Sequence, residues 1–199
     1  MTLPLSTAII RKTRCEVSKL TIALQTTRLL LRPFERKDAA IVQSLAGQYE
    51  VARTTLSLPH PYPDGAAEAW IDFRKDAAKH GHGYTFAIVE SASRQVMGCI
   101  SLTISAEHRR AEIGYWLGKQ YWGQGYATEA ATRIVRFGFE ALQLNRILGA
   151  AMTKNPASCA VLRKAGLKHE GTFKQHIRKW DHFEDLDYFG ITKEAYFSN

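Results

Sequence analysis

The sequence predicts a single domain of the α/β (α+β) class, with one mixed sheet packed against helices. Three observations indicate this class. The predicted elements follow the order β-α-α-β-β-β-α-β-α-β-β. No internal repeat, low-complexity tract or linker interrupts the chain after residue 26. The chain has 199 residues, 45% of them hydrophobic, which is enough for one large core without disulfide bonds.

The first half of the chain is expected to contain one strand and two helices. Residues 27–34 are leucine-rich and read as a strand that ends near a proline. Residues 38–48 have apolar side chains at helical spacing, with Asp38 as the predicted N-cap. Three prolines make residues 54–65 a loop, and residues 66–79 follow as an amphipathic helix.

The second half is expected to alternate strands with two further helices. Two β-rich runs joined by a polar turn predict a hairpin, and a third strand follows it. Pro156 suits the first turn of the last predicted helix. The strands are expected at residues 84–90, 96–105, 111–117, 146–152, 171–178 and 186–196, and the helices at residues 126–142 and 156–166.

The basic character of the chain is partly a property of its beginning. The formal net charge is +8, and residues 1–25 hold four basic side chains against one acid. We expect residues 1–25 to form a flexible basic tail and residues 26–199 to form the domain. Basic side chains elsewhere are scattered, without a one-sided basic helix, which disfavours nucleic acid as a partner.

Cysteine content and hydropathy predict a cytoplasmic protein. The three cysteines, an odd number without a C-x-x-C pair, favour neither a disulfide framework nor a zinc ribbon. No uncharged run approaches the roughly 20 residues of a membrane-spanning helix, so no membrane partner is expected. His80 and His82 have no third ligand near them in the sequence, and no metal is expected. A monomer and a homodimer both remain open.

The most informative segment is residues 112–131, where a strand meets a glycine loop and then a helix. Gly123 and Gly125 permit positive φ and close approach of a ligand to the backbone. The free N–H groups and the dipole of the helix N-terminus form a site for an anion. A simple turn between strand and helix is the alternative. The spacing is not G-x-G-x-x-G, because Thr128 stands at the third position, and no Gly-Lys-Ser/Thr of a P-loop occurs.

This segment resembles motif A of the GNAT superfamily of acetyl-CoA-dependent N-acetyltransferases. Trp122-Gly-Gln-Gly-Tyr-Ala127 matches its Arg/Gln-x-x-Gly-x-Gly/Ala loop except at the first position. Within the superfamily the chain is most similar to the RimJ/RimL type of ribosomal-protein N-terminal acetyltransferase. The resemblance implies a mostly antiparallel, twisted sheet with helices on both faces, the acyl-CoA N-acyltransferase fold. Further supporting phrases, in the same order, are Thr27–Phe34, Glu112–Leu117, Asn155–Ser158 and Gly171–Gln175.

The resemblance implies an enzyme that transfers acetyl from acetyl-CoA to a primary amine by direct attack in a ternary complex. A protein N-terminal amine of the ribosomal-protein type is the expected acceptor. A small-molecule amine, such as an antibiotic or a polyamine, is an alternative acceptor. A non-catalytic acyl-CoA-binding module is an alternative function. The resemblance also places the acceptor against the proline-rich loop and the helix after it, beside Pro59, His60, Tyr62 and Trp70.

The resemblance further implies which residues bind acetyl-CoA. The diphosphate is expected on backbone N–H groups of the glycine loop and first helical turn, and the pantetheine beside the preceding strand. There the Leu117 N–H is expected to polarise the thioester carbonyl. Asn155 is expected to contact the pantetheine, to cap its helix, or both, and Lys164 to share the 3′-phosphate with Arg163. The expected cofactor-binding residues are Tyr115, Trp116, Leu117, Trp122, Gly123, Gln124, Gly125, Tyr126, Ala127, Thr128, Asn155, Ser158 and Arg163.

Glu112 is the candidate general base. The attacking amine is protonated at neutral pH, and a carboxylate within reach, directly or through a water, can take its proton. The alternative is a surface acid paired with Arg109 or Arg110. Glu170 and His176 are competing candidates for the base.

Ser158 is the second candidate catalytic residue. The RimJ/RimL type offers a serine there, and its hydroxyl can donate a hydrogen bond to the leaving sulfur. The sequence departs from the family at Leu162, where many members have a tyrosine that protonates the thiolate. It departs again at Ile177, where RimL-type enzymes carry an acid, which shifts weight to Glu112.

Overall fold

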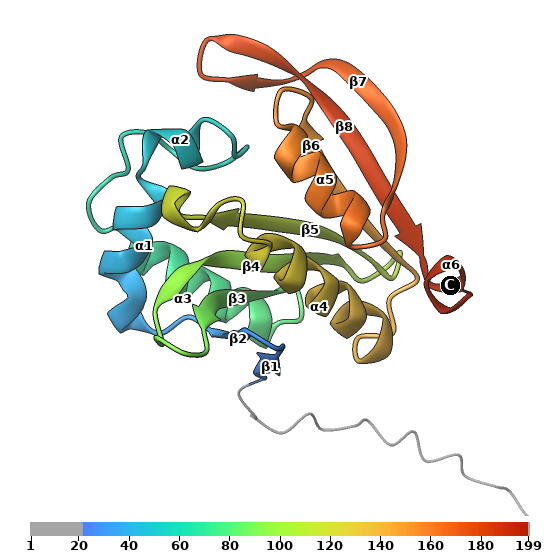
Figure 1. The fold of residues 1–199 in the computed structure, drawn as a ribbon, viewed down its shortest axis with the longest axis horizontal. Helices are drawn as coiled ribbons and strands as arrows, with labels where there is room; N and C mark the ends of the chain where they lie inside the picture. Colours follow the sequence, from blue (N-terminus) through green and yellow to red (C-terminus); the bar gives the residue numbers. More distant parts are fainter. Residues whose placement is uncertain (1–21, 199) are drawn as a thin grey trace, which may run out of the picture.

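A single eight-stranded sheet organises the described part of the chain, residues 22–198 of the computed structural model (Figure 1). Its strand order is β1-β2-β3-β4-β5-β6-β8-β7, and every neighbouring pair is antiparallel except β5 with β6. The predicted mixed, mostly antiparallel sheet is therefore confirmed. The strands are β1 Leu24–Gln25, β2 Leu29–Pro33, β3 Gly83–Glu90, β4 Val96–Ser105, β5 Arg110–Leu117, β6 Arg146–Met152, β7 Lys168–Lys179 and β8 His182–Thr192.

Helices cover both faces of the sheet because side chains alternate across each strand. In β4, Ile100 and Leu102 enter the larger core with helices α4 and α5, whereas Cys99 enters a second core with α1 and α3. The helices are α1 Ala39–Ala46, α2 Tyr49–Ala52, α3 Ala66–Lys79, α4 Tyr126–Glu140, α5 Pro156–Lys164 and α6 Lys193–Phe197, with short 3₁₀ turns η1 Arg36–Asp38 and η2 Lys119–Tyr121.

Three local expectations differ from the structure. Residues 1–21 of the expected tail lie outside the described residues, but Leu24 and Gln25 form β1, with Leu24 buried against the core. Asp38 is the N-cap residue of α1 as predicted, but its side chain makes no capping hydrogen bond, because its carboxylate binds the Arg32 guanidinium at 2.7 and 2.9 Å and the Glu35 N–H. The last strand ends at Thr192, whose side chain accepts from the Ala195 N–H and starts α6.

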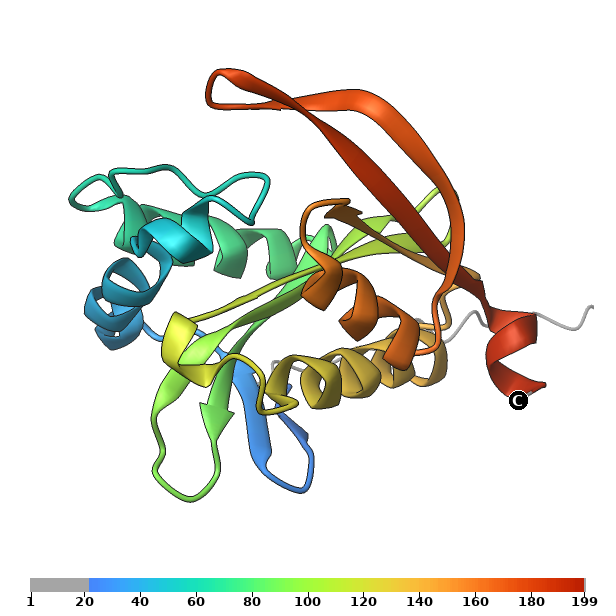
Figure 2. The same cartoon turned by 45° about the horizontal axis from the view of Figure 1, so that its top comes forward.

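The two central strands separate along their length, which opens the middle of the sheet (Figure 2). β5 and β6 pair only from Arg110↔Arg146 to Ile113↔Gly149. Beyond Ile113, β5 pairs only with β4, and β6 continues to pair with β8. The second half of β5 therefore has an open edge that faces the N-terminus of α5.

The long β7–β8 hairpin arches over this opening and reaches the loop after α2 (Figure 1). Near its tip, the Lys179 ammonium donates to the Leu58 carbonyl at 2.8 Å. The Trp180 ring stacks on Tyr49, with centroids 5.5 Å apart. These contacts fix the loop against the hairpin and so position one wall of the opening. Within the described residues, no helix is both long and apolar enough to cross a membrane.

Candidate functional site

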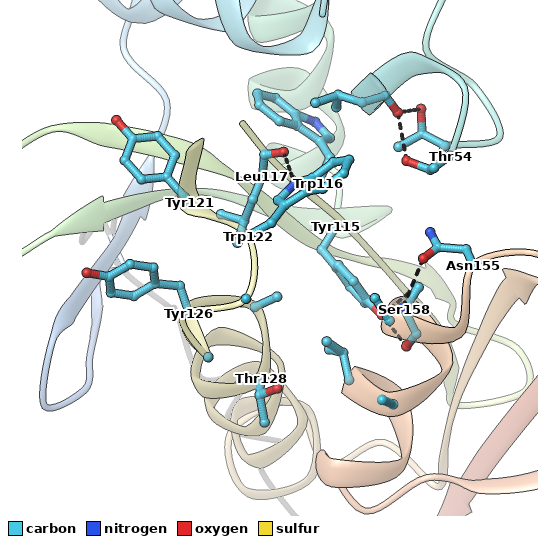
Figure 3. A pocket seen from close by; sticks show the side chains of 18 of the residues that line it. Thr54, Tyr115, Trp116, Leu117, Tyr121, Trp122, Tyr126, Thr128, Asn155 and Ser158 are labelled. Carbon is cyan, nitrogen blue, oxygen red and sulfur yellow. Dashed lines mark hydrogen bonds between the residues drawn. The ribbon is translucent and has the colours of Figure 1, made fainter. Parts of the chain in front are cut away.

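A cleft of about 350 Å³ lies between the open half of β5 and the N-termini of α4 and α5 (Figure 3). We call it the α4–α5 cleft. It brings together the glycine loop, the first turns of two helices and the end of a strand. Its lining residues are Val51, Thr54, Thr55, Tyr115, Trp116, Leu117, Tyr121, Trp122, Gly123, Gly125, Tyr126, Ala127, Thr128, Asn155, Ala157, Ser158, Ala160, Val161 and Lys164.

The glycine loop presents backbone rather than side chains to this cleft. Gly123 and Gly125 have φ of 74° and 82°, a left-handed conformation that glycine adopts without strain. Gly125 is the N-cap of α4, and the first intrahelical bond runs from Glu129 N–H to its carbonyl. The N–H groups of the first turn therefore have no intrahelical partner, and several of them border the cleft. This arrangement suits a phosphate group.

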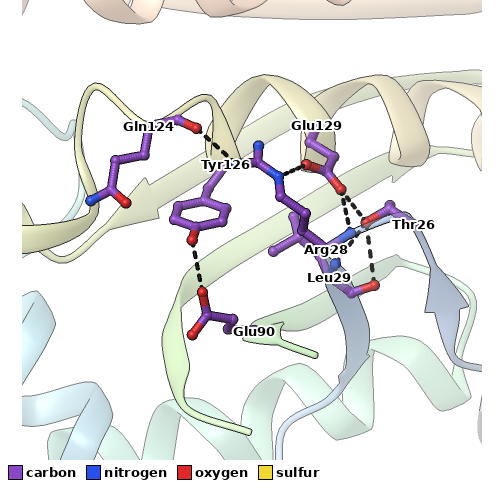
Figure 4. Close-up of polar contacts among 7 residues, drawn as sticks. All are labelled: Thr26, Arg28, Leu29, Glu90, Gln124, Tyr126 and Glu129. Carbon is purple, nitrogen blue, oxygen red and sulfur yellow. Dashed lines mark hydrogen bonds and ion pairs between the residues drawn. The ribbon is translucent and has the colours of Figure 1, made fainter. Parts of the chain in front are cut away.

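A cluster of charged and aromatic side chains holds the loop in place (Figure 4). Arg28 Nη1 donates to the Gln124 carbonyl at 3.1 Å, and Arg28 Nε binds the Glu129 carboxylate at 2.7 Å. The guanidinium also lies over the Tyr126 ring, whose hydroxyl donates to Glu90 at 2.7 Å. Glu129 thus pairs with Arg28, the residue just before β2. The loop is anchored through its own backbone and through α4.

The hydrogen-bond pattern of β5 shows which of its backbone groups face the opening. The Gly118 N–H donates to the Met97 carbonyl at 2.9 Å. Bonded and non-bonded positions alternate along an antiparallel pair, so Trp116 also faces β4. Tyr115 and Leu117 therefore turn their N–H and C=O groups toward the open edge. An extended amide-bearing ligand in the cleft would find backbone donors and acceptors there.

The Trp122 side chain binds one of these open backbone groups, the Leu117 carbonyl. Its indole Nε1–H donates to the Leu117 carbonyl at 2.8 Å, while 43% of the residue stays exposed. The family motif has Arg or Gln at this position. Here the side chain ties the loop to the end of β5 and leaves the Leu117 N–H available to a ligand.

A pair of hydroxyl groups lies where the cleft meets the sheet. Asn155 caps α5, its side-chain oxygen accepting from the Ser158 N–H at 3.1 Å. Ser158 Oγ is 2.8 Å from the Tyr115 hydroxyl, which also donates to the Ser158 carbonyl at 3.0 Å (Figure 3). Burial raises the pKa of Tyr115, although the Ser158 hydrogen bond opposes this, so its hydroxyl stays protonated at physiological pH.

A second cleft of about 360 Å³ opens on the other face of the sheet, and we call it the α3 cleft. It shares Thr54, Thr55, Tyr115, Trp116 and Ser158 with the α4–α5 cleft, so the two meet at the hydroxyl pair. Its remaining lining residues are Leu56, Ser57, Leu58, Trp70, Arg74, Cys99, Ser101, Thr103, Glu112, Ile113, Gly114, Ala150, Ala151 and Met152.

Glu112 lines the α3 cleft and is exposed there. No ion pair of Glu112 with Arg109 or Arg110 is found among the described residues. Burial and the nearby Glu112 charge raise the pKa of Tyr188 on β8. The Glu112 carboxylate therefore lies within electrostatic range of the Tyr188 hydroxyl.

The competing bases are placed differently. Glu170 forms an ion pair with Arg146 and does not line either cleft. His176 Nε2 is 3.1 Å from the Tyr188 hydroxyl, on the hairpin that arches over the opening. Ile177 lies on the same hairpin, and Leu162 is buried in the main core. Of the candidate acids, Glu112 is the one at the α3 cleft.

The structure brings together most of the residues predicted to bind the cofactor, with two exceptions. The Gln124 side chain turns away to donate to the Gln120 carbonyl at 2.9 Å, and the contact expected of its backbone N–H stays a prediction. The Arg163 guanidinium lies over the Phe189 ring, 5.2 Å from its centroid, and Lys164 is the basic residue that lines the α4–α5 cleft. Both Gln124 and Arg163 are exposed and outside the cleft lining.

The predicted acceptor wall is largely replaced by other residues. Of the four residues expected there, only Trp70 lines the α3 cleft. His60 packs between Tyr49 and Trp180 instead. The loop contributes residues 54–58 to the wall, because the hairpin contact at Leu58 holds this part against the opening.

The sequence predicted neither the role of the Tyr115 hydroxyl nor the place of Arg74 in a cleft. The Tyr115 hydroxyl meets Ser158 only because β5 and α5 are adjacent in space. Arg74 follows Trp70 by one helical turn and therefore points to the same side of α3. The i, i+4 spacing of Trp70 and Arg74 can be read from the sequence, but the cleft that they line cannot. Within residues 22–198, no group of three or more His, Cys, Asp or Glu side chains is arranged to hold a metal ion.

Comparisons with known proteins agree with this geometry. The family model described as "Acetyltransferase (GNAT) domain" matches residues 28–168. The N-acetyltransferase p20 of Bacillus licheniformis is 31% identical over 87% of this chain and 97% of its own. The spermidine N(1)-acetyltransferase of Escherichia coli K12 is 29% identical over 71% of this chain and 73% of its own. The structure of Mycobacterium smegmatis RimJ in complex with CoA-disulfide has a TM-score of 0.78 and 25% identity, covering 88% of this chain and 89% of that one.

Proposed function

Given that this chain belongs to the GNAT family of acetyl-CoA-dependent N-acetyltransferases, we propose that it acetylates a protein N-terminal amine by direct attack in a ternary complex. The observation that carries the proposal is the meeting of two clefts at Tyr115 and Ser158. One cleft offers backbone donors to an anion, and the other offers a carboxylate to an amine. Two substrates can therefore approach a common point from opposite faces of the sheet.

The α4–α5 cleft fits the polyanionic half of acetyl-CoA. An ideal Cβ built at Gly123 would meet no atom within 4 Å, so the space in front of the loop is open to a ligand. The diphosphate is held by N–H groups of the loop and of the first α4 turn, and the helix dipole favours its charge. Lys164 on the same wall supplies a positive charge for a further phosphate.

The open edge of β5 positions the reacting group. Tyr115 and Leu117 bind the pantetheine amides as a neighbouring strand would, and the Leu117 N–H polarises the thioester carbonyl. The Ser158 and Tyr115 hydroxyls lie at the point where the sulfur leaves. Since the Tyr115 hydroxyl keeps its proton, the pair donates a hydrogen bond to the departing thiolate. The thiolate then takes the second proton, which the attacking nitrogen loses as it becomes an amide, and CoA leaves as the thiol.

Glu112 acts on the acceptor side. The incoming ammonium loses a proton to the carboxylate, directly or through a water, and the free amine attacks the acetyl carbon. The new C–N bond forms as the C–S bond breaks. A protein N-terminus is favoured as acceptor by the resemblance to the RimJ/RimL type and by the similarity to the "Putative ribosomal N-acetyltransferase YdaF" of Bacillus subtilis. A small-molecule amine is the alternative suggested by the spermidine acetyltransferase relative.

The proposal is tested by measuring thiol release from acetyl-CoA with a panel of peptides and small amines. Mass spectrometry of the products then identifies which nitrogen is acetylated. We expect turnover with peptides that have a free N-terminus and none with the same peptides blocked by N-methylation to a tertiary amine. Turnover that is equal for free and blocked peptides, or absent for every amine while acetyl-CoA still binds, would contradict the proposal.

A further inference from the structure

The charges of the α3 cleft are few and of opposite sign. Arg74 and Glu112 are the charged side chains among its lining residues. Most of the other lining residues are uncharged polar or apolar. A polyamine would place several positive charges beside Arg74 with only one acid to balance them. The cleft is therefore better matched to an acceptor that itself carries both signs of charge.

Arg74 has neither an ion-pair partner nor a hydrogen-bond partner among the described residues. No carboxylate of the described residues lies within 4.0 Å of its guanidinium, and its Nε is buried without a hydrogen-bond partner in that part of the chain. The guanidinium packs against the Trp70 and Phe73 rings, 5.7 Å from each centroid. These contacts orient the group but leave its donors unused. A half-buried arginine with free donors is suited to bind an oxyanion.

The sheet register places Cys99 and Glu112 at opposite ends of the α3 cleft. Cys99 pairs with Trp116, Ser101 with Gly114, and Thr103 with Glu112, and all six line the cleft. The Cys99 and Thr103 rows are four residues apart, or about 13 Å of strand. Arg74 and Cys99 line the same cleft, and the Arg74 charge opposes the rise to about 12 that burial causes in the pKa of the Cys99 thiol, so the two side chains are within electrostatic range. Glu112 lies at the other end.

We propose that the acceptor carries a carboxylate on the same molecule as its amine, with Arg74 binding the carboxylate and Glu112 facing the amine. This inference rests on the proposed function and narrows its acceptor. A carboxylate is favoured over a phosphate monoester because Arg74, the one cation among the described residues that line this cleft, would leave the second phosphate charge unbalanced. The shared chemistry fits two sources, an acidic residue next to a protein N-terminus and a free amino acid.

Matched acceptors test the inference. One pair consists of hexapeptides that begin Ala-Asp or Ala-Asn, and the other of 4-aminobutyrate and its amide. We expect at least one acidic member to be used with a kcat/KM about tenfold above that of its neutral partner. The peptide and free-acid arms show which source is preferred.

Variants at Arg74 assign the effect to this side chain. We expect Arg74→Gln to raise KM for the acidic acceptor about tenfold, to leave the neutral acceptor and acetyl-CoA affinity unchanged, and Arg74→Lys to restore part of the loss. Lys75→Gln removes the same charge from the next, exposed position of α3 and is the matched control. A thermal melt of each variant separates loss of folding from loss of recognition.

Two outcomes overturn the inference while leaving the proposed function in place. In one, wild-type enzyme uses acidic and neutral partners equally. In the other, Arg74→Gln weakens both partners to the same extent. No turnover with any free amine, in protein that still binds acetyl-CoA, would instead contradict the proposed function.

Discussion

The α4–α5 cleft and the α3 cleft meet at the same two hydroxyls but are built from different parts of the chain. The anion-facing wall of the α4–α5 cleft comes from a short contiguous stretch, residues 123–128, and offers mainly backbone. The α3 cleft gathers side chains from residues 54–58, α3, β4, β5 and β6. The first site thus depends on a local conformation, and the second depends on how distant elements pack.

This difference indicates which substitutions each cleft tolerates. A backbone site is insensitive to side-chain identity unless the new side chain fills the space or changes its charge. A side-chain site loses its chemistry when one group is replaced. The two clefts should therefore respond separately, one through acetyl-CoA affinity and the other through acceptor turnover.

Replacing the candidate base should give the largest effect. We expect Glu112→Gln to lower kcat/KM for the amine about 100-fold, because general-base catalysis contributes on that order. Acetyl-CoA affinity measured by calorimetry should change less than twofold. Glu107→Gln, at an exposed acid in the turn before β5, is the control. A Glu112→Gln enzyme within threefold of wild type would exclude this residue as the base.

A negative charge in the α4–α5 cleft should weaken acetyl-CoA binding, which Glu112→Gln leaves nearly unchanged. Thr128 borders the α4–α5 cleft in the first turn of α4, where an acid stabilises the helix but repels a diphosphate. We expect Thr128→Glu to raise the Kd for acetyl-CoA at least about tenfold, about 1.4 kcal/mol. Thr128→Gln introduces a side chain of the same size as Glu without its charge and should raise the Kd for acetyl-CoA much less. Equal effects of Glu and Gln would mean that the pocket is blocked by size rather than by charge.

The Tyr115 and Ser158 hydroxyls lie where the two clefts meet, and their removal should lower kcat. Tyr115→Phe and Ser158→Ala are each expected to lower kcat about fivefold, since each removes one hydrogen bond worth roughly 1 kcal/mol. The double variant should be little worse than the poorer single variant, because the two groups act together. Fully multiplicative losses in single-turnover measurements would show that the two hydroxyls act independently.

Loosening the support of the loop should have a smaller effect. Arg28→Ala removes the bond to the Gln124 carbonyl and the ion pair with Glu129. We expect acetyl-CoA affinity to fall about threefold, with acceptor KM unchanged. Arg133→Ala is the control, because Arg133 is on α4 but binds the Gln25 carbonyl away from the loop. An acceptor-specific defect in Arg28→Ala would contradict the separation of the two clefts.

The pH profile should show no loss of activity on the alkaline side. Burial raises the pKa of Tyr115 above its ordinary value near 10, so its proton is retained as pH rises to about 9.5. We expect kcat/KM to increase with pH as the amine deprotonates and then to level off. A descending limb below pH 9.5 that disappears in Tyr115→Phe would show that the hydroxyl titrates earlier than its burial implies.

The sequence predicted the elements that rest on local patterns. Helix α4 starts within the predicted glycine loop, and Pro156 begins α5 after its Asn155 cap. Expectations about side-chain partners were less successful. The Asp38 carboxylate binds Arg32 instead of capping α1, Arg163 lies over Phe189, and His60 packs in the hairpin contact instead of lining the α3 cleft. Each of these partners is distant in sequence or on another element.

By itself the sequence determined the glycine loop, the anion site that follows from it and the family to which these phrases belong. Backbone conformation at Gly123 and Gly125 is set by residues within a few positions, so a one-dimensional pattern can carry it. Only the tertiary structure decided that β5 and β6 separate after Ile113, that Tyr115 meets Ser158, and that Arg74 and Glu112 share a cleft. Those contacts join residues tens of positions apart, and they arise from packing across the sheet rather than from local propensity.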